Sequence, residues 1–169
     1  MFKKLFSLVV FAGLFSGLAS AQAMKVGVVD FTRAINETHE GKAAQARLDS
    51  MVAGKKAELE QMEASLKALA AEYQTKGPTL SAEAREGYEQ RLYQGQGQLQ
   101  QAAAMNEQAM QAQYVQVMDT VFNSLKAQAS AIGKAGGYTV ILESSQGGVL
   151  FAKDGIDLTD KVIARANGK

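Results

Sequence analysis

The chain has 169 residues, no cysteine, a single histidine, and 18 basic side chains against 17 acidic ones. Without cysteine it has neither disulfide bonds nor a thiolate nucleophile, and one histidine cannot build a histidine-based metal cluster. Near-neutral charge creates no strong field that would attract nucleic acid. The sequence also has no G-x-S-x-G and no phosphate-binding Gly-Lys motif. We therefore expect no enzyme, no metal, no other cofactor and no nucleic-acid partner.

The first 23 residues are typical of a secretory signal peptide. Lys3 and Lys4 precede an apolar stretch, residues 5–18, and the Ala-Gln-Ala sequence at 21–23 matches the cleavage pattern. A membrane anchor is the alternative, but the stretch is shorter than the roughly 20 residues of a spanning helix. We expect cleavage before Met24, or two residues earlier, and export to a bacterial periplasm. The remaining chain has 16 basic and 17 acidic side chains, a formal charge of −1.

The exported chain begins with a predicted β-strand over residues 26–30, which is rich in valine. Asp30 ends this strand, and we expect it to cap the next helix rather than to act as a catalytic acid. His39 is interpreted as a surface or capping residue at a helix start. A lone strand needs a partner, and the other strand signals come after residue 134.

Residues 40–75 carry the heptad pattern of a coiled-coil helix. From Leu48 onward the pattern steps by four and three residues, and seven of eight positions are apolar. The eight positions are Leu48, Val52, Lys55, Leu59, Met62, Leu66, Leu69 and Tyr73. The spacing predicts one helix about 54 Å long.

A Gly-Pro pair at 77–78 ends this helix, because proline lacks the amide proton and clashes with the preceding turn. Thr79 or Ser81 suits the N-cap of a second long helix. Two long helices with a short link form an antiparallel hairpin. We expect a helical-hairpin arm over residues 39–133, with its tip near residues 76–80.

The second helix is predicted to run to about Ile132, and its two halves differ. The later half continues the steps of three and four at Tyr114, Met118, Val121, Leu125 and Ile132. Residues 93–113 lose the pattern and are rich in glutamine and alanine. Glycine inside a helix costs about 1 kcal/mol relative to alanine, so Gly87, Gly95 and Gly97 are candidates for arm flexibility. A solvated face without a special role is the alternative.

The C-terminal region supplies the missing strands. YTVILE at 138–143 and VLFA at 149–152 predict a β-hairpin with a five-residue loop, which would pair with the first strand. A short helix follows, with Asp157 or Thr159 as its cap.

These strands predict a small β-body made of residues 24–38 and 134–169. Three short strands cannot bury a core alone, so we expect several copies to pool their sheets. The candidate residues of this oligomerisation body are Val26, Val28, Val29, Val140, Leu142, Val149 and Phe151.

Aromatic and sulfur-containing side chains along the arm are candidate contacts for a partner. Tyrosine offers apolar area with a polar end, and methionine adapts to irregular surfaces. The candidates are Tyr73, Tyr88, Tyr93, Met105 and Met110. Packing within the hairpin is the alternative, especially for Tyr73.

Both ends of the chain resemble one known family. KVGVVDFTRAINETHEGKAAQARLD, residues 25–49, resembles the N-terminal segment of the Skp/OmpH family of periplasmic chaperones. GGYTVILESSQGGVLFAKDGIDLTDKVIARAN, residues 136–167, resembles its C-terminal segment. The Val-Val-Asp strand end and DLTDKV are the most specific pieces, and the resemblance covers essentially the whole chain after the signal peptide.

The resemblance implies an ATP-independent holdase. It would bind unfolded outer-membrane β-barrel proteins in a cavity between tentacles, prevent their aggregation and assist their delivery to the outer membrane. The implied fold is α+β and mostly α: a jellyfish-like trimer with a small β-body and long antiparallel coiled-coil arms. A structural coiled-coil spacer or adaptor of the cell envelope is the alternative.

One feature departs from the family. Well-known members carry strongly basic tentacles, whereas residues 92–125 contain no lysine or arginine. The resemblance therefore carries over no lipopolysaccharide site and at most weak contact with a membrane surface. We expect weaker steering by charge than in those members, and client binding that is less sensitive to salt.

Overall fold

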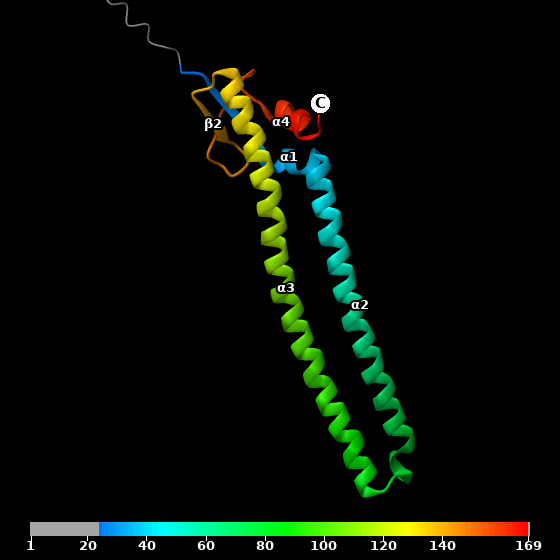
Figure 1. Ribbon diagram of the computed structural model, residues 1–169. Coiled ribbons are helices and arrows are strands. Elements are labelled where there is room, and N and C mark those ends of the chain that lie inside the picture. Colours follow the sequence, from blue (N-terminus) through cyan, green and yellow to red (C-terminus); the bar gives the residue numbers. More distant parts are fainter. Residues whose placement is uncertain (1–23, 169) are drawn as a thin grey trace, which may run out of the picture.

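The computed structural model describes residues 24–168, and the predicted signal peptide lies outside them. The elements are β1 (Val26–Val29), α1 (Phe31–Glu37), α2 (His39–Lys76), η1 (Gly77–Thr79), α3 (Ala82–Gly136), β2 (Val140–Glu143) and α4 (Thr159–Ala166). Figure 1 shows α2 and α3 as a long hairpin, with η1 at its tip, that projects from a small body formed by β1, α1, β2 and α4 at its base. The predicted class, α+β and mostly α with a helical-hairpin arm, is confirmed. Within the described part of the chain, no helix is long and apolar enough to cross a membrane.

Short polar side chains cap α1 and α2, the two helices that follow β1. Asp30 caps α1 as predicted, because its Oδ1 accepts a hydrogen bond from the Arg33 amide at 2.8 Å. The buried Thr38 caps α2 by accepting from the Gly41 amide at 3.2 Å. A Cβ at Gly41 would collide with the Ile35 carbonyl, so the two helices meet in a turn that only glycine permits.

The tip of the arm lies where the Gly-Pro pair predicts it. The residues after α2 form the single turn η1, with the proline in its first turn. Ser81 then caps α3 by accepting from the Ala84 amide at 3.2 Å. At its other end, α3 stops at Gly137, whose φ of 64° is a left-handed conformation suited to glycine.

The apolar core lies at the base of the arm. Phe31 meets Phe122 edge to face, with ring centroids 4.9 Å apart. The buried apolar residues of this cluster are Val29, Phe31, Ala34, Ala44, Leu48, Val117, Val121, Leu125, Ala129, Leu158 and Val162. The core therefore joins β1, α1 and α4 to the proximal ends of both long helices.

The sheet differs from the predicted hairpin, which is wrong for the single chain. β1 and β2 pair in parallel, with Val26 opposite Val140. The other edge of β1 bonds the segment before α4: Val28 N donates to the Ile156 carbonyl at 2.9 Å, and Leu158 N to the Val28 carbonyl at 2.8 Å.

Residues 149–152 form no strand in this chain. The segment around Asp157 also runs parallel to β1. The chain therefore has to run back from the end of β2 before it can pair with β1 again, and residues 144–155 form this return segment. Leu150 and Phe151 lie in this return, where they are 96% and 85% exposed. The sequence pattern identified their strand character but not the lack of a pairing partner.

Candidate functional site

The arm is thin beyond its base. Between residues 49 and 116 every side chain is exposed or half-buried. The two helices therefore meet along one seam without a second layer to cover it. Such a hairpin keeps its shape through few buried contacts, which leaves most of its surface available to a partner.

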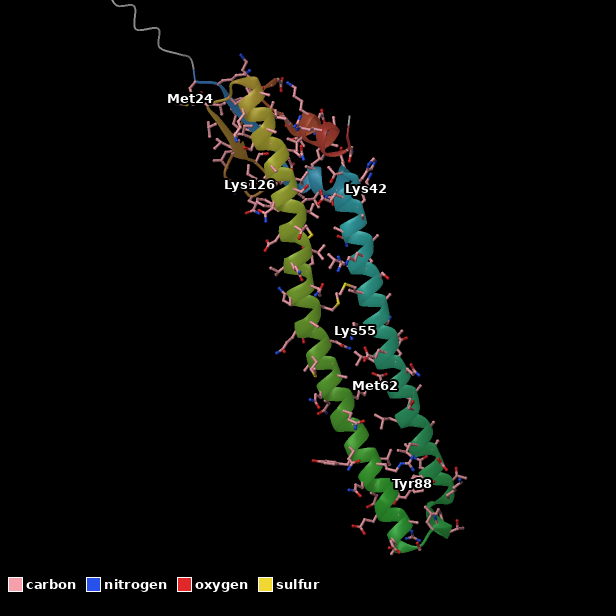
Figure 2. All side chains as sticks on the ribbon, in the orientation of Figure 1. Met24, Lys42, Lys55, Met62, Tyr88 and Lys126 are labelled. Carbon is pink, nitrogen blue, oxygen red and sulfur yellow. The ribbon has the colours of Figure 1, made fainter. Side chains whose placement is uncertain are left out.

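The α2 side of the seam follows the predicted heptads with one shift. Met51 is half-buried, whereas Val52, which the pattern placed on the seam, is 52% exposed. Figure 2 shows Lys55 and Met62 on the side of α2 that faces α3. The first position of the seam after Leu48 is therefore Met51 and not Val52, and the later predicted positions are unchanged.

The α3 side continues through the stretch that the sequence pattern left without a seam. Its half-buried residues are Ala84, Tyr88, Leu92, Gly95, Leu99, Ala102, Asn106, Met110 and Gln113. The prediction missed them because several are small or polar, although they keep the steps of three and four. Nearer the base, Val117 is buried while Tyr114, predicted on the seam, is 51% exposed. Met118 is partly buried at the edge of the core.

Gly95 differs in its surroundings from the other two glycines proposed to soften the arm. A Cβ at Gly95 would collide with Cδ2 of Leu66, so the glycine lets the helices approach there. Gly87 and Gly97 have open space at the same position. The flexibility of all three stays a prediction, and Gly95 has a packing role in addition.

A polar layer interrupts the seam halfway along the arm. Lys55 Nζ donates to Glu58 at 2.9 Å, and this hydrogen bond is the main reason why the pKa of Glu58 is lowered. Asn106 faces the same carboxylate closely enough to lower that pKa slightly, yet its buried Nδ2 has no partner that meets hydrogen-bond geometry. A polar layer of this kind favours one register of two helices over others.

The tip is fastened by two tyrosines. Tyr73 and Tyr88 stack with ring centroids 5.5 Å apart. Tyr73 donates its hydroxyl to Glu89 at 2.6 Å, and Tyr88 donates to Glu72 at 2.9 Å. Lys76 also donates to Glu72 and, as the leading cause, lowers the pKa of that carboxylate. We call this arrangement the tip clasp: Glu72, Tyr73, Lys76, Tyr88 and Glu89.

The five predicted partner-contact residues therefore lie in different surroundings. Tyr73 and Tyr88 belong to the tip clasp, and Met110 lies in the seam. Tyr93 and Met105 remain 80% and 60% exposed on α3. Neither Tyr93 nor Met105 belongs to the tip clasp, and their role as partner contacts stays a prediction.

The predicted oligomerisation residues also differ in how far they are buried. Val28 and Val29 are buried in the core, and Val26 and Val149 are half-buried. Val140 and Leu142 on β2 are 37% and 44% exposed, and Phe151 is almost fully exposed to solvent. A hollow of about 470 Å³ lies between β2 and α3, and its lining includes Phe31, Phe122 and Leu142. The free edge of β2, which does not pair with β1, and the 149–152 segment are unpaired strand surfaces within one chain.

Two carboxylates hold the body loops together. Burial alone would raise the pKa of Glu143, but hydrogen bonds from Ser145, Gln146 and the Phe31 amide outweigh it and lower the pKa. Burial would also raise the pKa of Asp157, but hydrogen bonds from the Thr159 hydroxyl and amide outweigh burial, so the pKa is lowered. The predicted cap at Asp157 or Thr159 is wrong, because Leu158 is the N-cap residue of α4 and makes no side-chain capping bond. Asp157, one residue earlier, accepts a hydrogen bond from the Thr159 amide at 2.8 Å.

Reactive groups do not gather in the structure. Among residues 24–168, no group of three or more His, Asp and Glu side chains is placed to hold a metal ion. His39 is exposed at the first position of α2, where its amide donates to Asn167 at 2.8 Å. Exposed apolar side chains of the described residues include Tyr93 and Met105 on the arm and Leu142 and Phe151 in the body.

Comparisons with known proteins agree with this architecture. A sequence profile of the family described as outer membrane protein (OmpH-like) matches residues 25–165. The "Chaperone protein Skp" of Yersinia enterocolitica is 23% identical over 145 residues, which cover 86% of this chain and 87% of that protein. A crystal structure from Caulobacter crescentus, described as an OmpH-like outer membrane chaperone, matches with a TM-score of 0.79 at 22% identity and covers 92% of this chain and 90% of that one. Since the family profile spans almost the whole described chain, the protein belongs to the OmpH-like family, the Skp/OmpH family that both its ends resemble.

Proposed function

We propose that this protein is a periplasmic chaperone that holds unfolded outer-membrane proteins without ATP. Membership of the OmpH-like family supports the proposal, as do the names of its relatives, one a chaperone and one an outer membrane chaperone. The observation that carries it is the arm, in which no residue from 49 to 116 is fully buried. An arm of this kind offers a large, compliant surface for weak and plural contacts.

The client chemistry matches such contacts. Unfolded barrel strands alternate apolar and polar residues, and their unpaired edges aggregate in water. A holdase must cover these chains without recognising one motif, so exposed Tyr93 and Met105 suit it better than a shaped pocket would. Release needs no fuel if insertion into the membrane offers the client a more favourable state.

The working form in this proposal is a trimer. Residues 149–152 of one copy would pair with the free edge of β2 in a neighbour, and Phe151 would enter the hollow beside Leu142. This arrangement removes the unpaired edge and covers the exposed apolar side chains at the same time. The proposed division is a signal peptide over 1–23, a trimeric body from 24–38 and 134–169, and an arm over 39–133.

Light scattering tests the proposal. A urea-unfolded outer-membrane barrel protein is diluted into buffer with or without the chain from residue 24, and no ATP is added. We expect the chain to suppress aggregation. Unchanged aggregation in the presence of a stable oligomer would instead favour a structural spacer of the envelope.

Two variants separate assembly from folding in this test. Phe151 and Gln146 are both exposed in the same loop, so neither Phe151→Asp nor Gln146→Asp disturbs the core of one chain. We expect Phe151→Asp to sediment as a folded monomer with weak holdase activity, and Gln146→Asp to stay trimeric and active. A trimeric Phe151→Asp would contradict the proposed body.

A further inference from the structure

The two long helices of the arm differ sharply in charge. α2 carries six basic and six acidic side chains over its 38 residues. Residues 92–125 of α3 carry only Glu107 and Asp119 over a similar length. On α2 the charges form ion pairs along the helix, such as Lys56 with Glu60 at 3.7 Å and Lys76 with Glu72 at 2.7 Å. A partner that covered α2 would have to remove these charges from water, which is costly.

The weakly charged stretch, residues 92–125, presents an exposed face along the arm. Exposed, uncharged residues lie along the side of α3 opposite the seam and define the α3 outer face: Tyr93, Gly97, Gln100, Ala104, Gln111 and Val115. One exposed carboxylate, Glu107, borders this face between Ala104 and Gln111. Tyr93 is 80% exposed and Val115 is 49% exposed. A shallow hollow runs over the middle of this face, beside Ala104, Gln111 and Val115, and Glu107 is the one charged residue in its lining.

The α3 outer face leads toward the free edge of β2. Figure 1 shows β2 on the side of α3 that faces away from α2. One and two turns beyond Val115, Met118 and Phe122 continue the same side of the helix, and Phe122 lines the hollow beside β2. The α3 outer face and the unpaired strand edge of the body therefore lie on one side of the molecule.

We propose that the α3 outer face is the surface on which the arm holds an unfolded, weakly charged polypeptide, whereas the charged face of α2 stays in contact with water. The inference rests on the proposed holdase function and assigns that function to one side of one helix. The structural reason is the combination of exposure and low charge along this face.

The amide side chains explain why the occupant is an extended chain. An unfolded client exposes backbone N–H and C=O groups, and a glutamine side chain both donates and accepts hydrogen bonds. Gln100 and Gln111 belong to the α3 outer face and Gln108 lines the same hollow, so a client backbone finds amide partners along this face. A helix from a second copy of this chain would find only two large apolar side chains on this face, Tyr93 and Val115.

Two matched sets of substitutions test the assignment. Gln100→Glu, Ala104→Glu and Gln111→Glu place three charges on the α3 outer face. Ala53→Glu, Ala57→Glu and Ala64→Glu place the same charges on exposed positions of α2 at the same spacing of four and seven residues. Both sets use a good helix former and change the net charge equally. The readout is the apparent affinity for a urea-unfolded outer-membrane barrel protein, with circular dichroism and sedimentation as checks on folding and assembly.

We expect the α3 set to weaken client binding at least tenfold and the α2 set to change it less than threefold. Equal losses in the two sets, or a larger loss in the α2 set, would overturn the inference. Failure of the unaltered chain to hold any client would overturn the proposed function itself, so the two failures are distinguishable.

Photo-crosslinking identifies the occupant directly. A photoreactive phenylalanine analogue at position 104 or 57 is irradiated in the client complex. We expect client adducts at 104 in clear excess over those at 57. Adducts at 104 that join two copies of this chain, with or without client, would show that a second arm occupies the face and would contradict the inference.

Discussion

Tyr73 and Tyr88 stack across the tip of the arm with ring centroids 5.5 Å apart, and each donates its hydroxyl to a carboxylate on the opposite helix. The two hydrogen bonds cross the hairpin in opposite senses, so they fix both the separation and the register of the helices. The arm is therefore fastened at both ends, by the core at its base and by the tip clasp at its end. We expect the half-buried seam between them to be the part of the arm that bends.

Removing the two hydroxyls should loosen the tip without unfolding the protein. In the double variant Tyr73→Phe and Tyr88→Phe the rings still stack, but the bonds to Glu89 and Glu72 are lost. We expect faster amide hydrogen exchange near the tip and unchanged exchange in the body. Tyr93→Phe, at an exposed site, is the control. Unchanged exchange at the tip in the double variant would mean that the clasp does not hold the hairpin.

Substitutions at Gly95 and Gly97 should have different effects. Gly95→Val places a branched side chain against Leu66 and should lower the free energy of unfolding by about 1–3 kcal/mol. Gly97→Val meets open space, so the change should stay below about 0.5 kcal/mol. Urea unfolding followed by circular dichroism measures both. Equal effects at the two sites would remove the packing role of Gly95.

Leucine truncations should report the uneven burial of the molecule. Leu125 is fully buried in the basal core, and Leu125→Ala should cost about 2–5 kcal/mol. Leu99 is half-buried in the seam, and Leu99→Ala should cost about 1 kcal/mol. Thermal and urea denaturation test the ranking. A seam truncation as costly as the basal one would contradict the description of a thin arm.

Acid should destabilise the body through Glu143 and Asp157. Both carboxylates have a folded pKa below the ordinary value, so the unfolded chain binds more protons in acid and stability rises with pH. Their contribution is present at neutral pH, above the unfolded pKa values near 4, and is lost as pH falls through the lower folded values.

Asp157→Asn isolates this contribution, because asparagine keeps an oxygen that accepts from Thr159 but does not titrate in this range. We expect urea unfolding of the variant to depend less steeply on pH between about 5 and 2 than that of the unaltered chain. Identical pH profiles would exclude Asp157 as a source of the acid sensitivity.

Client binding should depend only weakly on salt. Residues 92–125 contain no basic side chain, so little attraction is available for salt to screen. Affinity for an unfolded barrel protein should change little between low and high sodium chloride. Introducing Gln100→Lys, Ala104→Lys and Gln111→Lys together should create a salt dependence. Strong salt dependence in the unaltered chain would show that charges elsewhere dominate.

Local patterns predicted the parts of this fold that depend on neighbouring residues. The heptads from Leu48 indicate α2, the Gly-Pro pair marks the tip, and Asp30 and Ser81 cap the following helices as their types suggest. The seam of α3 was missed because a search for apolar positions overlooks Gly95 and Asn106. Extending the steps of three and four backward from Val121 would have found them.

The strand pairing depends on distant segments, and there the sequence was a poorer guide. Two strand-like runs joined by a short loop favour a hairpin, yet β2 pairs in parallel with β1 from the other end of the chain. The run at 149–152 has strand composition but no partner within the chain. The asymmetry of charge between the helices is visible in the sequence, but its relation to the free edge of β2 needs the fold.

The most direct test of the account is the mass of the client complex. The chain from residue 24 is mixed with a urea-unfolded outer-membrane barrel protein without ATP, and sedimentation with mass detection follows. The account predicts a soluble complex of three chains with one client, and a trimer in the absence of client. A stable monomer, or a trimer that leaves the client to aggregate alone, would contradict it.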